Sequence, residues 1–230
     1  MTPIDTTLIQ VIASRCGVTV RQAEHTVQLL AEGATVPFIS RYRKERTGGL
    51  DEVQVSAVKE QFERLSELEK RKETILASID EQGKLTPELR MKIEQCYEGA
   101  PLEDLYLPYR PKRRTRATVA REKGLEPLAA MLMRQDGARP DRLAERFVGG
   151  EVHDLQEALD GACDIIAEWV SESEAARSAM RRLFTREGVI SARVVKGKEQ
   201  EGAKYSDYFD WSEPLRRVAA HRLLAMVRAE

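Results

Sequence analysis

The sequence predicts an all-α fold, an elongated multi-helical scaffold with a helix-turn-helix-like N-terminus and a long helical hairpin. The composition supports this fold, because 42% of the residues are hydrophobic, 33% are charged and only 6% are aromatic, as in helical proteins with polar outer faces. Apolar residues also recur at helical spacing along most of the chain. Only one run, "VISARVV" at residues 189–195, is rich in the β-branched residues typical of strands.

Three short helices are expected at the N-terminus. The first spans about residues 5–14, with apolar residues along one side. Thr19 begins the second helix, because Gln22 three residues later completes a capping box. Pro37 begins the third, since a proline in the first turn of a helix sacrifices no hydrogen bond. Short helices joined by tight turns predict the helix-turn-helix-like layout.

The third short helix would be the DNA-reading helix of such a layout. We expect Phe38 and Ile39 to form its buried face, and Arg41, Arg43 and Lys44 follow as candidate contacts to nucleic acid. Recognition helices usually carry polar residues at their N-terminal end, whereas this segment begins with "VPFI". The pattern therefore disfavours the reading of bases by this helix.

A long helical hairpin is expected from Asp51 to Gly99. Asp51 caps a helix that runs to about Gln82 and, at 1.5 Å per residue, spans roughly 45 Å. The charged run "SELEKRKE" in its middle is interpreted as a solvated face or a bend. Thr86 and Pro87 begin the return helix.

The remainder of the chain is expected to be helical between irregular connections. The segment "PLEDLYLPYRPKRRTR" contains three prolines and predicts a mostly irregular connection. Ser171 and Glu174 form a capping box that opens a helix to about Arg186. The β-like run is expected either to stay extended or to pair with a segment outside this sequence, because one strand makes no sheet. A last helix is expected from Ser212 to Met226. The other expected helices span about residues 117–123, 126–135, 142–147 and 154–170.

No motif in the sequence indicates an active site. HExxH, GxSxG, CxxC and GxxxxGK[ST] are all absent, so we expect no enzymatic activity, no metal and no cofactor. Cys16, Cys96 and Cys163 are widely spaced and odd in number, which favours reduced thiols over a disulfide framework. No apolar run approaches the roughly 18 residues that suggest a membrane span. These features predict a cytoplasmic protein with no membrane partner.

The strongest local signal is a basic segment, "YRPKRRTRATVAREKG", from Tyr109 to Gly124. It holds seven Lys or Arg residues and one acid, in a chain whose net charge is −1. Its cations lie on an expected irregular backbone beside a tyrosine whose ring is able to stack on a base. The candidate nucleic-acid-binding residues here are Arg110, Lys112, Arg113, Arg114 and Arg116, with Tyr109, in addition to Arg41, Arg43 and Lys44.

Two functional interpretations of this basic segment remain open, besides a plain solvated surface. The cations are suited to backbone phosphates of nucleic acid. Arginine forks also bridge to acidic helices, and the acidic hairpin from Asp51 to Gly99 lies just upstream in the sequence. In the second interpretation the region is a purely structural or protein-interaction module.

Three long segments together resemble the N-terminal region of the bacterial Tex family of transcription accessory proteins. They are "ATVPFISRYRKERTGGLDE", "LEDLYLPYRPKRRTRATVAREKGLEPLA" and "VVKGKEQEGAKYSDYFDWSEPLRRVAAHRLLAM". Members of this family are longer, and they carry an RNase-H-like domain, helix-hairpin-helix elements and a C-terminal OB-fold RNA-binding domain. The resemblance implies a cytoplasmic, nucleic-acid-binding transcription factor in which the OB-fold domain is the main binder.

The resemblance also implies how this sequence is organised. Residues 1–190 are expected to form a Tex-type N-terminal helical domain, and residues 191–230 an extended segment plus a helix leading to further domains. The implied partners are RNA or DNA, bound mainly through the C-terminal domains, and RNA polymerase or other transcription proteins. The alternative is a module that docks onto RNA polymerase or the other domains and contacts no nucleic acid itself.

Overall fold

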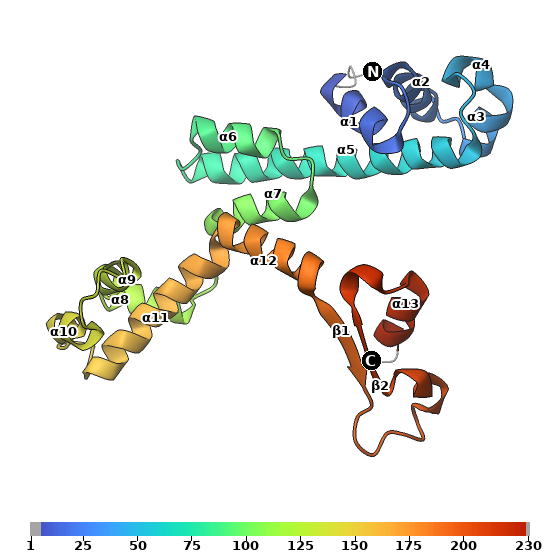
Figure 1. Cartoon of the computed structure of the whole chain (residues 1–230). Coiled ribbons are helices and arrows are strands. Elements are labelled where there is room, and N and C mark those ends of the chain that lie inside the picture. Colours follow the sequence, from blue (N-terminus) through green and yellow to red (C-terminus); the bar gives the residue numbers. More distant parts are fainter. Residues whose placement is uncertain (1–5, 229–230) are drawn as a thin grey trace. The chain divides into compact units, whose positions relative to one another are not determined.

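The chain divides into two compact units, Met1–Tyr109 and Arg110–Glu230, of which the computed structural model describes residues 6–109 and 110–228 (Figure 1). The expected all-α class is confirmed, with one small two-stranded sheet in the second unit. The domain boundary near residue 190 stays a prediction. The first unit consists of α1 (Thr6–Cys16), α2 (Val20–Ala31), α3 (Val36–Tyr42), α4 (Lys44–Thr47), α5 (Glu52–Glu81), α6 (Pro87–Glu94), α7 (Gly99–Tyr106) and the 3₁₀ turn η1 (Leu107–Tyr109).

The N-terminal helices α1 and α2 pack against the first half of α5. Ile12, Val27 and Leu65 are fully buried in the core that these helices share. The capping box of Thr19 and Gln22 is confirmed, since the Thr19 hydroxyl accepts the backbone N–H of Gln22 and the Gln22 side chain accepts that of Thr19. The three expected short helices are therefore present, with the short α4 in addition. The expected start of the first helix at residue 5 lies outside the described residues.

The expected buried face of α3 is only half right. Ile39 is fully buried and Ser40 is 5% exposed, whereas Phe38 is 39% exposed. The helix begins at Val36, and its inward side consists of Ile39 and Ser40, with the partly buried Val36. This phase leaves Phe38 and Tyr42, four residues apart, on the outer side.

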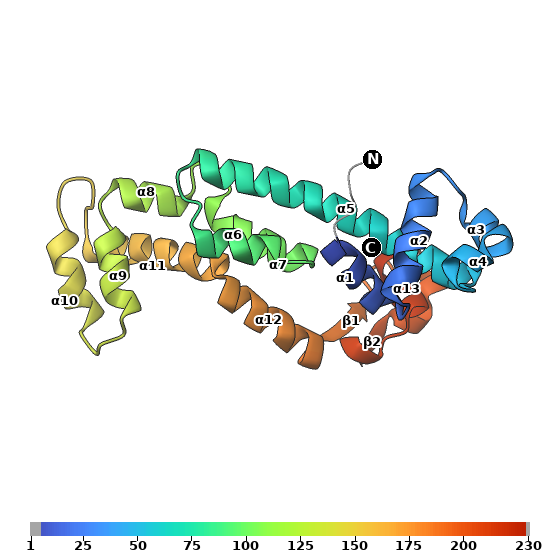
Figure 2. The ribbon, with the colours of Figure 1, turned by 90° about the horizontal axis from the view of Figure 1, so that it is seen from above.

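The long helix of the hairpin is confirmed with its caps. Asp51 accepts the backbone N–H of Gln54 in a second capping box, and Gln82 is the C-cap. The return helix α6 ends at Glu94 rather than at Gly99. Both α6 and α7 lie along the second half of α5 (Figures 1 and 2).

The prediction of a mostly irregular connection after the hairpin is wrong, because α7 and η1 occupy the first nine residues of that segment, 101–109. Pro101 lies in the first turn of α7, where a proline is tolerated. Leu102 and Tyr106 follow at four-residue spacing and are buried against Ile75 and Ile79 of α5. This apolar pair offsets the helix-breaking tendency of the prolines.

The interpretation of "SELEKRKE" as a solvated face is also wrong at Lys72, which is 2% exposed. Its ammonium donates to Glu69 Oε1 at 2.7 Å and to the backbone carbonyl of Glu94 at 2.7 Å. It also lies 4.3 Å from the ring centroid of Tyr97. Lys72 follows Leu65 by seven residues, so both face the same side of α5. The ammonium thereby ties α5 to the end of α6.

We predict that Lys72→Met lowers the free energy of unfolding by about 1–2 kcal/mol, because methionine fills the space but leaves the Glu94 carbonyl without its donor. Lys70→Met is the matched control, since Lys70 lies on the exposed side of α5. Urea unfolding of both variants measures the difference. Equal free energies of unfolding for the two variants would show that the buried ammonium adds nothing.

The second unit is built around the long helix α11. Leu125, Leu128 and Ile165 are fully buried in its core, and Gly161 of α11 lets Leu125 approach its backbone closely. The unit consists of α8 (Arg116–Glu122), α9 (Glu126–Met133), α10 (Pro140–Ala144), η2 (Glu145–Phe147), α11 (Leu155–Glu172), α12 (Glu174–Glu187), β1 (Val189–Arg193), η3 (Ala203–Tyr208), β2 (Asp210–Pro214), η4 (Leu215–Arg217) and α13 (Ala220–Arg228).

Two expected element boundaries in this unit are wrong. The helix expected to start at Ser171 starts two residues later, because the Ser171 hydroxyl donates to the Glu168 carbonyl within α11. Ser173 instead accepts the backbone N–H of Ala176 and caps α12. The helix expected from Ser212 begins only at Ala220.

The β-like run finds its partner inside the chain. Val189–Arg193 pairs antiparallel with Asp210–Pro214, so that Val189 lies opposite Pro214 and Ala192 opposite Trp211. Ser212 therefore lies in a strand, and the expectation of an extended chain or an outside partner is overturned. The two strands are separated by 16 residues that include η3, and this loop carries no short hairpin signal.

Candidate nucleic-acid interface

The basic loop, defined here as residues 110–116, leads from the start of the second unit into α8. Its backbone is irregular up to Thr115, which caps the helix by accepting the backbone N–H of Thr118 at 3.1 Å. The Thr118 hydroxyl in turn accepts the backbone N–H of Thr115 at 3.3 Å. The C-terminal end of the loop is therefore fixed by local hydrogen bonds.

Glu168 of α11 anchors the middle of the basic loop. Its Oε1 accepts hydrogen bonds from Lys112 Nζ at 3.1 Å and from Arg121 Nη1 at 2.7 Å. Its Oε2 accepts the Thr115 hydroxyl at 3.1 Å. The Glu168 side chain is only 10% exposed. Lys112 also reaches Glu172 Oε1 at 2.5 Å, so one turn of α11 binds the loop through two carboxylates.

These hydrogen bonds control the protonation of Glu168. Burial by itself raises the pKa of this carboxyl, but the hydrogen bonds from Arg121 and Lys112 outweigh burial and hold the pKa below its ordinary value. Glu168 therefore stays ionised in the folded unit down to lower pH than an exposed glutamate. The charge that anchors the loop is maintained at neutral pH.

Two further loop cations contact acids near the surface. Arg114 Nη2 lies 2.6 Å from Glu122 Oε2, and both side chains are more than half exposed. Arg116 Nη2 lies 3.3 Å from Asp164 Oδ1, and the Arg116 side chain is 88% exposed. Exposed pairs of this kind contribute about 0–1 kcal/mol. Arg114 and Arg116 are therefore able to leave these carboxylates at little cost.

Arg110 and Arg113 complete the loop and are exposed. Within residues 6–228, neither side chain has a hydrogen-bond or ion-pair partner. The loop thus presents two unpaired guanidinium groups on either side of the anchored Lys112. The acids that hold its other cations lie on α8 and α11 of the same unit. Bridging to the upstream hairpin stays a prediction.

Tyr109 ends the first unit and packs into it. Its partly buried ring contacts the apolar cluster formed by α5, α6 and α7. Its backbone carbonyl accepts a hydrogen bond from Gln82 Nε2 at 2.8 Å. The Tyr109 ring therefore packs against the core of the first unit, although the sequence predicts that this ring stacks on a base.

Arg41, Arg43 and Lys44 lie at the end of α3 and the start of α4. They belong to the first unit, whereas the basic loop belongs to the second. Arg41 and Lys44 are exposed. The Arg43 guanidinium lies 5.0 Å from the ring centroid of Phe38, and its Nη1 donates to the Tyr42 carbonyl at 3.1 Å.

Helix α12 forms a third basic surface, which is absent from the predictions made from the sequence. Helix α12 buries none of its residues and carries four arginines. Its Arg182 and Arg186 line a shallow groove of about 300 Å³. The repeated four-residue spacing in "RSAMRRLFTR" is the signal that would have revealed this arginine stripe. The four are Arg177, Arg181, Arg182 and Arg186.

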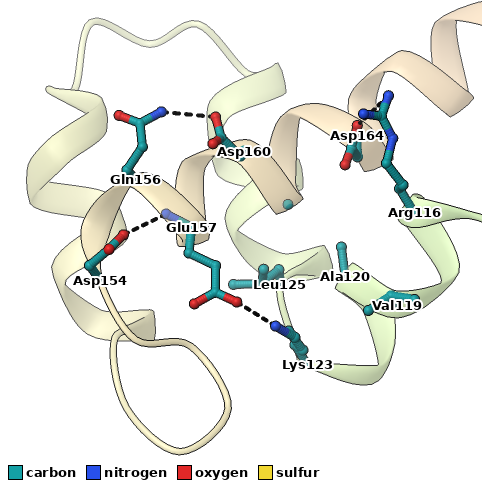
Figure 3. A pocket seen from close by; sticks show the side chains of 11 residues that line it. Arg116, Val119, Ala120, Lys123, Leu125, Asp154, Gln156, Glu157, Asp160 and Asp164 are labelled. Atoms are coloured by element: carbon teal, nitrogen blue, oxygen red, sulfur yellow. Dashed lines mark hydrogen bonds and ion pairs between the residues drawn. The ribbon is translucent and has the colours of Figure 1, made fainter.

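A larger groove of about 480 Å³ lies between α8 and α11 (Figure 3). The groups lining it pair with one another: Lys123 binds Glu157, and Gln156 Nε2 donates to Asp160 Oδ1 at 2.8 Å. Across residues 6–228, no group of three His, Cys, Asp or Glu side chains is placed to hold a metal ion. The charged groups that line the groove are thus largely paired with one another.

In the part of the chain that the structure describes, no helix combines the length and the apolar character needed to cross a bilayer.

Two family models match the chain. The Tex-like protein N-terminal domain matches residues 6–80, and the Tex central region-like model matches residues 135–230. The basic loop lies between the two matched segments.

Similar proteins match almost the whole chain. The transcriptional accessory protein Tex of Neisseria gonorrhoeae is 44% identical over 221 residues, which cover 96% of this chain and 29% of that protein. Protein YhgF of Escherichia coli is 46% identical over 221 residues, covering 95% and 29%. The human S1 RNA-binding domain-containing protein 1 is 26% identical over 239 residues, covering 97% and 23%. The chain thus spans about 29% of its bacterial relatives and belongs to the Tex family, as the two family models and these relatives together show.

Proposed function

We propose that this chain is the helical scaffold of a nucleic-acid-binding transcription accessory factor, and that its basic loop is an auxiliary contact for backbone phosphates. Arg110 and Arg113 make the contact. Lys112 and Thr115, held by Glu168, fix the backbone that presents them. The proposal includes no catalytic step.

The division of the loop cations into anchored and unpaired groups carries this proposal. Lys112 and Arg121 neutralise Glu168 and order the loop, whereas the charges of Arg110 and Arg113 have no partner among the described residues. A loop that is ordered before binding loses less conformational entropy on binding. Guanidinium groups also match phosphate oxygens in a two-pronged geometry.

The relatives support the nucleic-acid part of the proposal. One is named a transcriptional accessory protein and another an S1 RNA-binding domain-containing protein. Most of their length lies outside the matched region. The basic loop is therefore proposed as one contact among several in the whole protein.

The test is the salt dependence of binding for Arg110→Ala/Arg113→Ala. The equilibrium constant of the chain is measured between 50 and 200 mM salt with single-stranded RNA, single-stranded DNA and duplex DNA. Each lost phosphate contact reduces the slope of log K against log salt by about 0.7 for single strands and about 0.9 for duplex. We expect the double variant to lose about 1.4 for single strands and about 1.8 for duplex.

A variant with the same charge loss elsewhere in the second unit is the matched control. Arg134 and Arg142 are exposed and have no ion-pair partner among the described residues, so Arg134→Ala/Arg142→Ala tests the effect of net charge alone. Parallel lines for the wild type and Arg110→Ala/Arg113→Ala would reject the phosphate contact. An equal loss of slope in both double variants would show that the loss comes from the change in net charge and not from a phosphate contact of the basic loop.

A second candidate function has an observation in its favour. Lys112 and Arg116 already contact carboxylates of α11, as in a loop that braces helices. In that case the region is a structural or protein-interaction module that docks onto RNA polymerase or the other domains of the protein. The same double variant would then leave nucleic-acid binding unchanged and weaken a protein complex.

A further inference from the structure

Helix α3 carries two exposed aromatic rings that the core of the first unit does not use. Phe38 is 39% exposed and Tyr42 is 64% exposed. They lie four residues apart, on the side of α3 opposite Ile39 and Ser40, which are buried. Exposed aromatic side chains that gather on one surface mark an interaction site more often than scattered ones do.

The two rings hold one another in place. Their centroids are 5.6 Å apart with the planes inclined by 42°. Arg43 lies 5.0 Å from the Phe38 centroid and donates to the Tyr42 carbonyl, so Phe38 contacts both Tyr42 and Arg43. Tyr42 is left as the more open ring. Because its neighbours already restrict it, a ligand that stacks on Tyr42 orders little new structure.

The charge around these rings favours an anionic partner. Residues 36–47 contain four Lys or Arg residues and one acid, Glu45. Arg41 and Lys44 are exposed, and within residues 6–228 neither has an ion-pair partner. The exposed ring of Tyr42 and the unpaired cations of Arg41 and Lys44 therefore occur together at the end of α3.

Of the anionic partners, a single strand of nucleic acid fits this combination best. It offers phosphates to the cations and unpaired base faces to the ring at the same time. A duplex hides its base faces in the stack, and an acidic peptide satisfies the cations without using the ring. We therefore take single-stranded nucleic acid as the partner of this surface of α3.

We propose that the α3 platform, formed by Phe38, Arg41, Tyr42, Arg43 and Lys44, binds single-stranded nucleic acid by stacking a base on Tyr42. Arg41 and Lys44 contact the flanking phosphates, and Phe38 with Arg43 supports the Tyr42 ring. The platform rests on the proposed nucleic-acid-binding function, but it lies in the other unit of the chain and uses bases as well as phosphates.

Substitutions of Tyr42 test the stacking in the whole chain by fluorescence anisotropy with a labelled 12-nucleotide single-stranded RNA. Tyr42→Ala is expected to weaken binding about 5- to 100-fold, as the loss of one base–aromatic stack does elsewhere. Tyr42→Phe keeps the ring and is expected to bind as the wild type does. Tyr42→Leu keeps the apolar bulk without the ring and is expected to behave as Tyr42→Ala.

An abasic oligonucleotide of the same length separates bases from phosphates. The wild type is expected to lose affinity for it about as much as Tyr42→Ala does for the intact RNA, whereas Tyr42→Ala is expected to bind the two oligonucleotides equally. The slope of log K against log salt stays unchanged in Tyr42→Ala, because its phosphate contacts remain. An unchanged melting temperature confirms that the exposed ring is not needed for folding.

The outcomes separate this proposal from that for the basic loop. Full affinity in Tyr42→Ala, or full rescue by Tyr42→Leu, would overturn the stacking platform even if Arg110→Ala/Arg113→Ala lowers the salt slope. An unchanged salt slope in that double variant, with weaker binding by Tyr42→Ala, would overturn the loop contact alone. A whole chain that binds none of the oligonucleotides would overturn both.

Discussion

Glu168→Gln is expected to lower the free energy of unfolding of the second unit by about 2–3 kcal/mol. The substitution keeps the shape of the side chain but removes the charge that pairs with Lys112 and Arg121. Both cations are about 30% exposed and Glu168 is 10% exposed, so water replaces the lost interactions only in part. Breaking a partly buried, hydrogen-bonded charge pair on one side costs this much because the other charges stay behind.

The difference in the free energy of unfolding between the wild type and Glu168→Gln depends on pH, because the pKa of Glu168 is lowered in the folded state. A carboxyl whose pKa is lower in the folded state stabilises that state above its unfolded pKa, about 4.3 for glutamate. That stabilisation is lost as the pH falls through the folded pKa. The difference between the wild type and Glu168→Gln is therefore expected to be full at pH 7 and to shrink below about pH 4.3.

Urea unfolding at pH 7 and at several acidic pH values measures both effects. Glu122→Gln is the matched control, because Glu122 contacts Arg114 through an exposed pair and its loss is expected to cost less than about 1 kcal/mol. Equal losses in the two variants, or a difference that does not shrink as the pH falls below about 4.3, would contradict the anchoring role of Glu168.

Gly161→Val is expected to destabilise the second unit by about 3 kcal/mol. Even the Cβ of an alanine at this position would lie 2.4 Å from Leu125 Cδ1 and 3.3 Å from Ala120 Cβ. Leu125 is fully buried, so its side chain moves only if the surrounding core repacks, and overpacking of this kind is costly. Gly161 therefore sets how closely α8 and α9 approach α11.

A double-variant cycle with Leu125→Ala checks this cause. Leu125→Ala alone is expected to cost about 2–5 kcal/mol, but it removes the atom with which the new side chain collides. The double variant is therefore expected to be more stable than the sum of the single losses by about 1 kcal/mol or more. Ala167→Val, at an exposed position of α11, controls for helix propensity. Additive losses would contradict the close approach at Gly161.

The sequence predicted most of the helices because their signals are local. The capping boxes at Thr19 and Asp51 depend on hydrogen bonds between residues three apart, and a short stretch of sequence is enough to recognise them. The phase of α3 was missed because seven residues define a helix face poorly. Phe38, an aromatic residue next to Ile39, was accordingly assigned to the core although it is exposed.

Features that depend on distant partners were not predictable in the same way. Lys72 is buried because the end of α6 brings a backbone carbonyl to it, 22 residues away. The run at Val189–Arg193 is predicted to be β-like, but a helix is expected from Ser212, inside its partner strand, because the strand Asp210–Pro214 contains proline and charged residues that are unusual in strands. Both cases depend on tertiary contacts that override local preference.

The candidate site shows the same division. The sequence identified the cations of the basic loop, since a cluster of charge is visible in a short stretch. It did not identify Glu168 as their anchor, because this residue follows Lys112 by 56 positions. It therefore gave no means of separating the anchored Lys112 from the unpaired Arg110 and Arg113.

The most direct test of this separation is an NMR titration of the arginine side chains with single-stranded RNA. The Nε–H signals of Arg110 and Arg113 are expected to shift as RNA is added, because these guanidinium groups meet the phosphates. The signal of Arg121 is expected to stay in place, because Glu168 holds it. Binding of RNA with unmoved Arg110 and Arg113 signals would contradict the proposed phosphate contact, as would a shift confined to Arg121.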